Sequence, residues 1–179
     1  MIFLVRHGEA TAGWGDHPDP GLSDLGHRQA EAAAQALLGF GAKAAVCSPM
    51  MRCRETASAF ERAAGCAATV EPVVSEIVTP EGVDDRVAWL RGYMEGTWEA
   101  EGAAFEIWRR DILMALAALP ENTAVFSHFV AINAAVSLID QDARTIVFRP
   151  GHCSITQIDF SGTVPRVAEY GSQAATRVL

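Results

Sequence analysis

The chain is poor in positive charge and has no long apolar run. Its 179 residues carry 14 Lys and Arg against 22 Asp and Glu, which gives a formal net charge of -8 at pH 7. This balance argues against general binding to nucleic acid or to an anionic membrane surface. No stretch approaches the roughly 20 apolar residues that a membrane-spanning helix needs. Any anionic ligand must therefore be held by a local cluster of cations.

Cysteine is also scarce, and the start of the chain has no basic segment ahead of an apolar one. The four cysteines lie in or beside apolar segments and form no C-x-x-C pair; they are Cys47, Cys53, Cys66 and Cys153. We therefore expect reduced core thiols and no zinc site. Because the N-terminal residues show no signal-peptide pattern, we expect a cytoplasmic protein.

What the sequence does contain is an alternation of apolar runs and helical patterns. The predicted strands are 2–5, 42–47, 68–74, 123–128, 145–148, 153–160 and 164–170. The predicted helices are 24–38, 48–65, 84–96, 105–119 and 130–139. This alternation predicts one α/β domain over residues 1–179, in three layers, with a mainly parallel central sheet. An antiparallel hairpin is expected near the C-terminus.

Local signals mark several of the expected element boundaries. Ser23 stands where the N-cap of the first helix should lie, and Ser48 holds the same place before the second. Pro49 then occupies the first helical position, which suits its fixed φ and missing N–H. The dipeptide Ser161-Gly162 predicts a tight turn between the last two strands.

Polar residues directly follow three of the predicted strands. They are Arg6 and His7 after the first strand, Ser48 and then Arg52 after the second, and Ser127 and His128 after the fourth. Each one alone would be explained more simply by a solvated strand end, a helix surface or a capped histidine at a helix start. Parallel strands bring their carboxyl ends to one edge of the sheet, where ligands bind. Two arginines, two histidines and a helix N-terminus at that edge would form an anion trap suited to phosphate.

Four segments in a fixed order carry a family resemblance. They are LVRHGEA at 4–10, LSDLGHRQA at 22–30, SPMMRCRETA at 48–57 and SH at 127–128. Together they resemble the histidine phosphatase superfamily, also called phosphoglycerate-mutase-like.

The resemblance implies a role for each of these strand-end residues. His7 would be the nucleophile that accepts the phosphoryl group, using one nitrogen of a neutral imidazole. Arg6 and Arg52 would hold the equatorial oxygens of the transferring group. His128 would donate a further hydrogen bond to the same oxygens. The resemblance implies no metal and no other cofactor.

The acid that protonates the leaving oxygen is less sharply marked. Glu76, just after the third predicted strand, lies where the family carries its acid, and burial or the incoming phosphate would have to raise its pKa. Glu81 and Asp84 are rivals a few residues later. The run EIVTPEGVDD departs from the glycine-rich pattern that often follows the acid, so these alternatives stay open.

Two other positions depart from the family pattern. Gly13 lies where mutases usually carry an asparagine that contacts substrate, and this argues against a mutase. Phe129 replaces the glycine that usually follows the second histidine, and it could either pack in the core or line the pocket. Trp14 is ambiguous in the same way. The loops at 10–21 and 77–105 are expected to set substrate specificity.

These observations predict a metal-independent phosphatase that forms a phosphohistidine on His7. Its partner would be a phosphorylated small molecule or a phosphohistidine protein, with no nucleic acid and no membrane; the oligomeric state is left open. The alternatives are a phosphoglycerate-type mutase and a non-catalytic phosphate-binding module. A cysteine-based phosphatase is excluded, because it needs an arginine six residues after Cys153 and Asp159 stands there.

Overall fold

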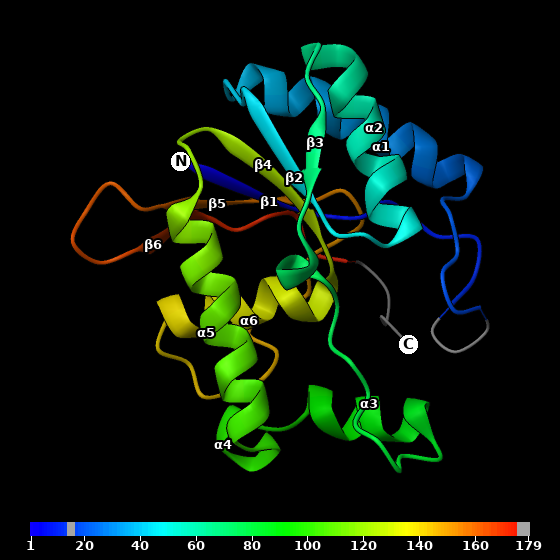
Figure 1. The fold of residues 1–179 in the computed structure, drawn as a ribbon, viewed down its shortest axis with the longest axis vertical. Helices are drawn as coiled ribbons and strands as arrows, with labels where there is room; N and C mark the ends of the chain where they lie inside the picture. Colours follow the sequence, from blue (N-terminus) through cyan, green and yellow to red (C-terminus); the bar gives the residue numbers. More distant parts are fainter. Residues whose placement is uncertain (14–16, 175–179) are drawn as a thin grey trace.

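A six-stranded mixed sheet forms the centre of the molecule (Figure 1). The computed structural model describes residues 1–13 and 17–174, so Trp14 lies outside the described residues. The strands are β1 (Ile2–Arg6), β2 (Ala44–Cys47), β3 (Ala68–Val70), β4 (Thr123–Ser127), β5 (Ile155–Asp159) and β6 (Arg166–Glu169), in the spatial order β3-β2-β4-β1-β5-β6. Strands β1 to β4 run parallel to one another, β5 runs antiparallel to β1, and β6 runs antiparallel to β5. The predicted α/β class, with a mainly parallel sheet and a C-terminal antiparallel hairpin, is confirmed.

Helices cover both faces of this sheet. They are α1 (Asp24–Gly39), α2 (Met51–Ala64), the short 3-10 turn η1 (Pro72–Val74), α3 (Arg86–Met94), α4 (Trp98–Glu101), α5 (Ala103–Ala118) and α6 (Phe129–Ile139). Successive side chains of a strand point to opposite faces. Ile2 and Leu4 of β1 therefore pack with the core under α5 and α6, while Phe3 and Val5 pack with α1 and α2. The continuous apolar run at the start of the chain is explained by this two-sided burial.

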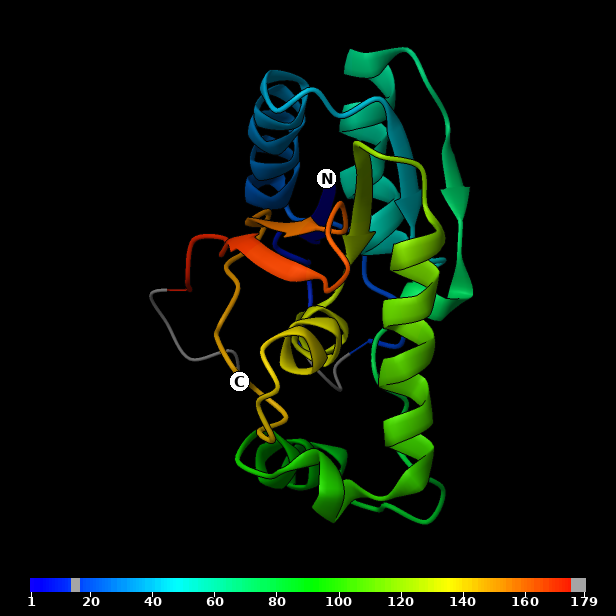
Figure 2. The ribbon, with the colours of Figure 1, turned by 90° about the vertical axis from the view of Figure 1, so that its left-hand side faces the viewer.

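Helices α3 and α4 lie at the far end of α5, away from the sheet (Figures 1 and 2). The segment after α6 reaches down to meet them. There the backbone N–H of Trp98 donates to the carbonyl of Ala143 at 3.0 Å, and the hydroxyl of Thr145 donates to the carbonyl of Tyr93. In the described part of the chain, no helix is long and apolar enough to cross a membrane.

Two predicted strands are shorter than expected or absent. Residues 145–148 form no strand, because the backbone N–H groups of Val147 and Phe148 donate to the side-chain oxygen of Asn133 on α6 at 2.8 and 3.1 Å. Strand β3 ends at Val70, and Pro72 then opens the 3-10 turn, since proline cannot donate to a strand ladder.

Two predicted boundaries also differ from the structure. A loop over residues 160–165 joins β5 to β6 in place of the tight Ser161-Gly162 turn. Ser23 caps α1 as predicted, with its hydroxyl accepting from the N–H of Gly26 at 3.0 Å. In contrast, α2 begins only at Met51, so Ser48 is not its N-cap.

The sheet order brings the three polar strand ends to one edge. Strand β4 lies between β2 and β1, with Arg6 level with Ser127 and Cys47 level with Phe126. The N–H of His7 donates to the carbonyl of Ser127 at 3.0 Å, which aligns the residues just beyond the two strands. The predicted convergence is confirmed.

Candidate active site

His7 lies immediately beyond β1 and is buried, with 8% of its surface exposed. Its Nδ1 lies 2.7 Å from the carbonyl oxygen of Gly8, so this nitrogen carries the proton and donates it. The lone pair therefore sits on Nε2. Burial, together with the nearby His128 and the two arginines, lowers the pKa of His7 well below 6.5. The ring is neutral at pH 7 and has one free nucleophilic nitrogen.

The loop after His7 is held by close backbone packing. A Cβ added to Gly8 would lie 2.7 Å from the carbonyl oxygen of Gly26, and one added to Gly26 would lie 2.1 Å from the carbonyl oxygen of Glu9. Both distances are far below van der Waals contact, so only glycine fits at either position. The hydroxyl of Thr56 accepts from the N–H of Gly8 at 3.0 Å, which ties the same loop to α2. Residues from three sequence motifs thus fix the position of His7.

Arg6 is 5% exposed and points its guanidinium into the site. Its Nη1 donates to the carbonyl of Pro150 at 2.9 Å, and its Cζ lies 5.2 Å from the ring centre of Phe129. Burial lowers the pKa of Arg6 to about 10, so the group stays charged at pH 7. Its Nε is buried without a hydrogen-bond partner in the described structure. An unsatisfied buried cationic donor is costly, and an anionic ligand would satisfy it.

Phe129 resolves one of the ambiguities left by the sequence. The ring is 2% exposed and belongs to the core under α5 and α6. It also lies against the Arg6 guanidinium at cation–π distance. Phe129 therefore packs in the core and also contacts the guanidinium of Arg6.

Arg52, His128 and Ser48 form a hydrogen-bonded chain. Nη2 of Arg52 lies 3.1 Å from Nδ1 of His128, and Nε2 of His128 lies 2.8 Å from the Ser48 hydroxyl. A guanidinium can only donate, so Nδ1 of His128 is the acceptor here and Nε2 carries the proton. Burial and the two site arginines lower the pKa of His128 well below 6.5. The ring is therefore neutral, and its centre lies 5.3 Å from that of His7.

Glu76 is the buried carboxyl of the site. Its oxygens accept from the N–H of Ile77 at 2.9 Å and from the N–H groups of Val130 and Ala131 at 3.2 Å. The last two lie in the first turn of α6, where the helix dipole favours an anion. Burial nevertheless raises the pKa of Glu76, and these hydrogen bonds and the two site arginines oppose that rise only in part.

The rivals of Glu76 lie elsewhere. Glu81 and Asp84 are exposed on the loop before α3, whereas Glu76 is 8% exposed and interacts electrostatically with both Arg52 and Arg6. The structure thus brings together His7, Arg6, Arg52, His128 and Glu76, and it leaves the two other carboxylates in solvent.

His152 also lies at the site, although the sequence analysis did not include it. Its ring centre is 5.9 Å from that of His7. It directly precedes the turn into β5, and β5 runs antiparallel to β1. The start of an antiparallel strand lies at the same sheet edge as the ends of its parallel neighbours. A polar residue just before the predicted C-terminal strand was the signal that could have identified it.

The side chains of the site are largely buried, and two of them are guanidinium groups. Among residues 1–13 and 17–174, no group of three or more His, Cys, Asp or Glu side chains is placed to hold a metal ion. Two guanidinium groups, one free imidazole nitrogen and a buried carboxyl can bind a phosphoryl group and transfer it.

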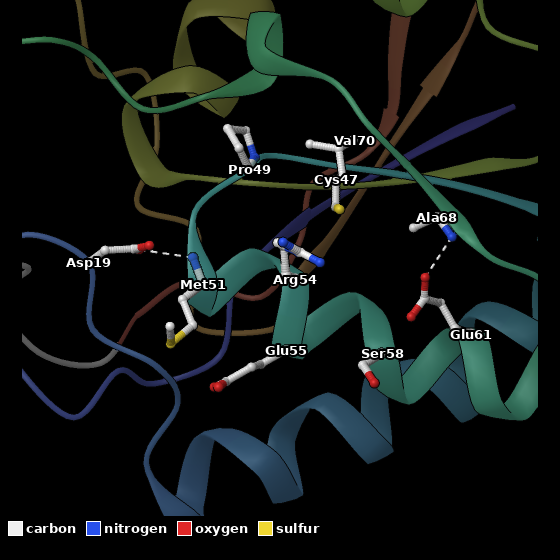
Figure 3. Close-up of a pocket in the computed structure, with 10 residues that line it drawn as sticks. All are labelled: Asp19, Cys47, Pro49, Met51, Arg54, Glu55, Ser58, Glu61, Ala68 and Val70. Carbon is white, nitrogen blue, oxygen red and sulfur yellow. Dashed lines mark hydrogen bonds between the residues drawn. The ribbon is translucent and has the colours of Figure 1, made fainter.

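A separate cavity of about 420 Å³ lies beside α2, between that helix and the strand segment with Ala68 and Val70 (Figure 3). It is lined by Asp19, Cys47, Pro49, Met51, Arg54, Glu55, Ser58, Glu61, Ala68 and Val70. Of the residues predicted for the site, none lines it. Asp19 links the two regions, because it accepts from the N–H of Met51 at 2.9 Å and lies 3.9 Å from Nη1 of Arg52.

Solved structures with the same fold cover nearly the whole chain. A mycobacterial glucosyl-3-phosphoglycerate phosphatase superimposes with a TM-score of 0.78 at 20% identity, covering 97% of this chain and 99% of that one. The phosphoserine phosphatase of Entamoeba histolytica, solved with 3-phosphoglyceric acid, gives a TM-score of 0.76 at 20% identity and covers 96% of each chain. At such identities the likeness establishes the fold.

Sequence comparison gives a narrower result. The Erwinia tasmaniensis protein named "Probable phosphoglycerate mutase GpmB" is 27% identical over 186 residues, covering 89% of this chain and 84% of that protein. The model of the histidine phosphatase superfamily (branch 1) matches residues 2–173. The chain therefore belongs to the histidine phosphatase superfamily.

Proposed function

We propose that the protein is a metal-independent phosphatase that works through a phosphohistidine on Nε2 of His7. The observation that carries this proposal is the tautomer of His7. Its Nδ1–H is held by the Gly8 carbonyl, which leaves Nε2 with its lone pair beside two arginines. A nucleophile must be neutral, oriented and close to the groups that bind its target, and His7 meets these three conditions.

Arg6 and Arg52 are assigned to the phosphoryl oxygens. Arg6 stays charged at pH 7 and has a buried Nε donor with no partner in the described structure. Planar guanidinium groups can grip the equatorial oxygens while the entering nitrogen and the leaving oxygen stay in line.

His128 is assigned a role that changes when phosphate binds. In the present arrangement its Nδ1 accepts from Arg52, so the ring holds that arginine in place. The Ser48 hydroxyl beside Nε2 can both donate and accept. When Arg52 turns to the phosphate, the ring can shift its proton to Nδ1 and donate to a phosphoryl oxygen.

Glu76 is assigned the proton that the leaving oxygen needs. Its buried position raises the pKa, and a bound phosphate dianion would raise it further. In the first step the His7 Nε2 bonds to phosphorus, the bond from phosphorus to the leaving oxygen breaks, and that oxygen takes the Glu76 proton. In the second step water releases phosphate and returns His7 to its neutral form.

Substitution of His7 by alanine tests this mechanism. We expect kcat on an aryl phosphate to fall by at least about 10⁴-fold, because the nucleophile is lost. The wild type should form an acid-labile, base-stable phosphoenzyme in a rapid-quench experiment, and His7→Ala should form none. His27→Ala, a change at an exposed histidine on α1, is the matched control. Undiminished turnover by His7→Ala would refute the mechanism.

A phosphoglycerate-type mutase is the second candidate, and the name of the 27% identical relative favours testing it. The assay panel should contain phosphoserine, glucosyl-3-phosphoglycerate, 3-phosphoglycerate and phosphohistidine peptides, since two of the similar folds are named for the first two. Release of inorganic phosphate without isomerised product would exclude the mutase. Tight phosphate binding with no phosphoenzyme at all would point to a non-catalytic module.

A further inference from the structure

His152 lies at the solvent-exposed side of the site, whereas His128 is buried. The ring centres of His152 and His7 lie 5.9 Å apart with the planes tilted by 42°. His128 is fully buried, whereas His152 is exposed. A hydrogen bond of about 2.9 Å from the His152 ring can therefore reach an oxygen near a group carried by His7.

The turn that carries His152 is fastened to β1. The N–H of Cys153 donates to the carbonyl of Arg6 at 3.0 Å, and the N–H of Arg6 donates to the carbonyl of Ser154 at 3.3 Å. The Arg6 side chain donates to the carbonyl of Pro150, which begins the same turn. Because these bonds go to the residue before His7, the position of His152 is set relative to the nucleophile.

This turn also contains a strained residue. Cys153 has a φ of 54°, in the left-handed region that non-glycine residues seldom adopt. The N–H of Ser154 donates back to the carbonyl of Gly151 at 3.1 Å and closes the turn. Strain of this kind persists where surrounding contacts determine the backbone, and it is concentrated at functional sites. Here it presents the His152 ring to the site.

The charge state of His152 suits contact with a neutral molecule. The residue is exposed overall, but partial burial of its ring, and after it the charge of Arg6, lowers the pKa of His152 to about 4, and the charge of Glu9 opposes this shift. At pH 7 the ring is therefore neutral and offers one donor and one acceptor nitrogen. It adds no positive charge to a pocket that already holds two guanidinium groups. An acceptor nitrogen open to solvent and beside His7 is what an attacking water needs.

We propose that His152 orients the water that hydrolyses the phosphohistidine on His7. This inference rests on the proposed function. The water oxygen bonds to phosphorus, the bond between phosphorus and the His7 Nε2 breaks, and its electron pair returns to that nitrogen. One water proton passes to the acceptor nitrogen of His152 and from there to solvent. The water attacks from the position that the leaving oxygen vacated, in line with the bond from phosphorus to Nε2. Glu76, whose oxygens accept from the start of α6, gave its proton in the first step and regains one from solvent.

Rapid-quench kinetics with an aryl phosphate tests this role, because a good leaving group makes formation of the phosphoenzyme insensitive to proton transfer. In His152→Ala we expect phosphoenzyme decay to slow on the order of 100-fold, with formation changed less than about 3-fold. The phosphoenzyme should then accumulate at steady state. His152→Gln, which keeps a hydrogen-bonding amide, should recover part of the decay rate, and His27→Ala should match the wild type.

Other outcomes would overturn the assignment. A variant with unchanged decay, or one with a raised KM and an unchanged kcat, would show that His152 contacts at most the ground-state substrate. If phosphoenzyme decay in His152→Gln is no faster than in His152→Ala, the hydrogen-bonding role is refuted. If His152→Ala does not fold, the comparison of His152→Gln with the wild type serves as the test. If the wild type forms no phosphoenzyme, the proposed function itself fails and this inference falls with it.

Discussion

The two faces of α2 contribute to regions that differ in exposure and in chemistry. One side is the cavity of about 420 Å³ in Figure 3, to which α2 contributes Arg54. The other side is the phosphate site, to which the same helix contributes Arg52. Residues two apart on a helix point to nearly opposite faces, so Arg52 and Arg54 lie in different surroundings although they belong to the same turn.

The comparison shows that open volume and reactive chemistry are separate properties. The Arg54 side chain is exposed, and its cavity also holds three carboxylates, from Asp19, Glu55 and Glu61. The Arg52 side chain is only 13% exposed; it contacts the neutral imidazole of His128 and lies 3.9 Å from Asp19, which it shares with the cavity. A charge removed from water interacts strongly with a ligand of opposite sign, whereas an exposed charge is screened by solvent and by its neighbours. The buried surroundings of Arg52 therefore make the stronger anion site.

The sharpest test of this difference is a pair of arginine substitutions. Arg52→Ala should lower kcat/KM on an aryl phosphate by about 10²- to 10³-fold, since a buried donor to the transferring group is lost. Arg54→Ala should stay within about twofold of the wild type. A large loss in Arg54→Ala would show that the cavity takes part in catalysis.

Binding of inorganic phosphate should separate the two sides at equilibrium. Phosphate at about 100 times its Kd stabilises a folded protein by about 2.7 kcal/mol. For a chain of this size that corresponds to a rise in Tm of roughly 5 to 10 °C. Scanning calorimetry should show this rise in the wild type and in Arg54→Ala, and a much smaller one in Arg52→Ala. An equal rise in all three would place the bound anion away from Arg52.

Serine hydroxyls on the two sides give a finer comparison. Ser48→Ala removes the partner of His128 Nε2 at 2.8 Å, and one such hydrogen bond is worth about 1 to 1.5 kcal/mol. We expect kcat to fall by about tenfold while KM changes little, because Nε2 of His128 has no Ser48 partner when Arg52 turns to the phosphate. Ser58→Ala, which changes the cavity, should behave as the wild type. An unchanged kcat in Ser48→Ala would remove Ser48 from the chain of site residues.

Ser48 also shows which kind of contact the sequence did not predict. Arg6, His7 and His128 follow apolar strands directly, so a local pattern was enough to place them, and the parallel order of β2, β4 and β1 follows from the alternation of strands and helices. Ser48 looked like a helix cap because capping is a local property. Its actual partner is an imidazole 80 residues away, and such a tertiary contact leaves no local signal.

His152 was missed for a related reason. Its placement depends on the direction of β5, and an isolated strand pattern carries no direction. The choice of Glu76 over Glu81 likewise depended on burial against the first turn of α6, which is a property of the folded chain. Residue types at strand ends were thus predictable, and their partners were not.

The remaining expected effect is a pH dependence of stability that comes from the two buried histidines of the site. Burial lowers the pKa values of His7 and His128 well below 6.5, whereas in the unfolded chain these rings titrate near 6.5. Below that pH the unfolded state binds more protons, so the free energy of unfolding falls as the pH falls, by up to about 1.4 kcal/mol per pH unit for each ring. Glu76, with its raised pKa, acts in the opposite direction at lower pH. Urea unfolding between pH 7 and 5 should therefore give a shallower slope in His128→Asn than in the wild type, while Arg54→Ala keeps the wild-type slope. Equal slopes in all three proteins would mean that His128 already holds a proton in the folded state, and its assigned hydrogen bonds would then be wrong.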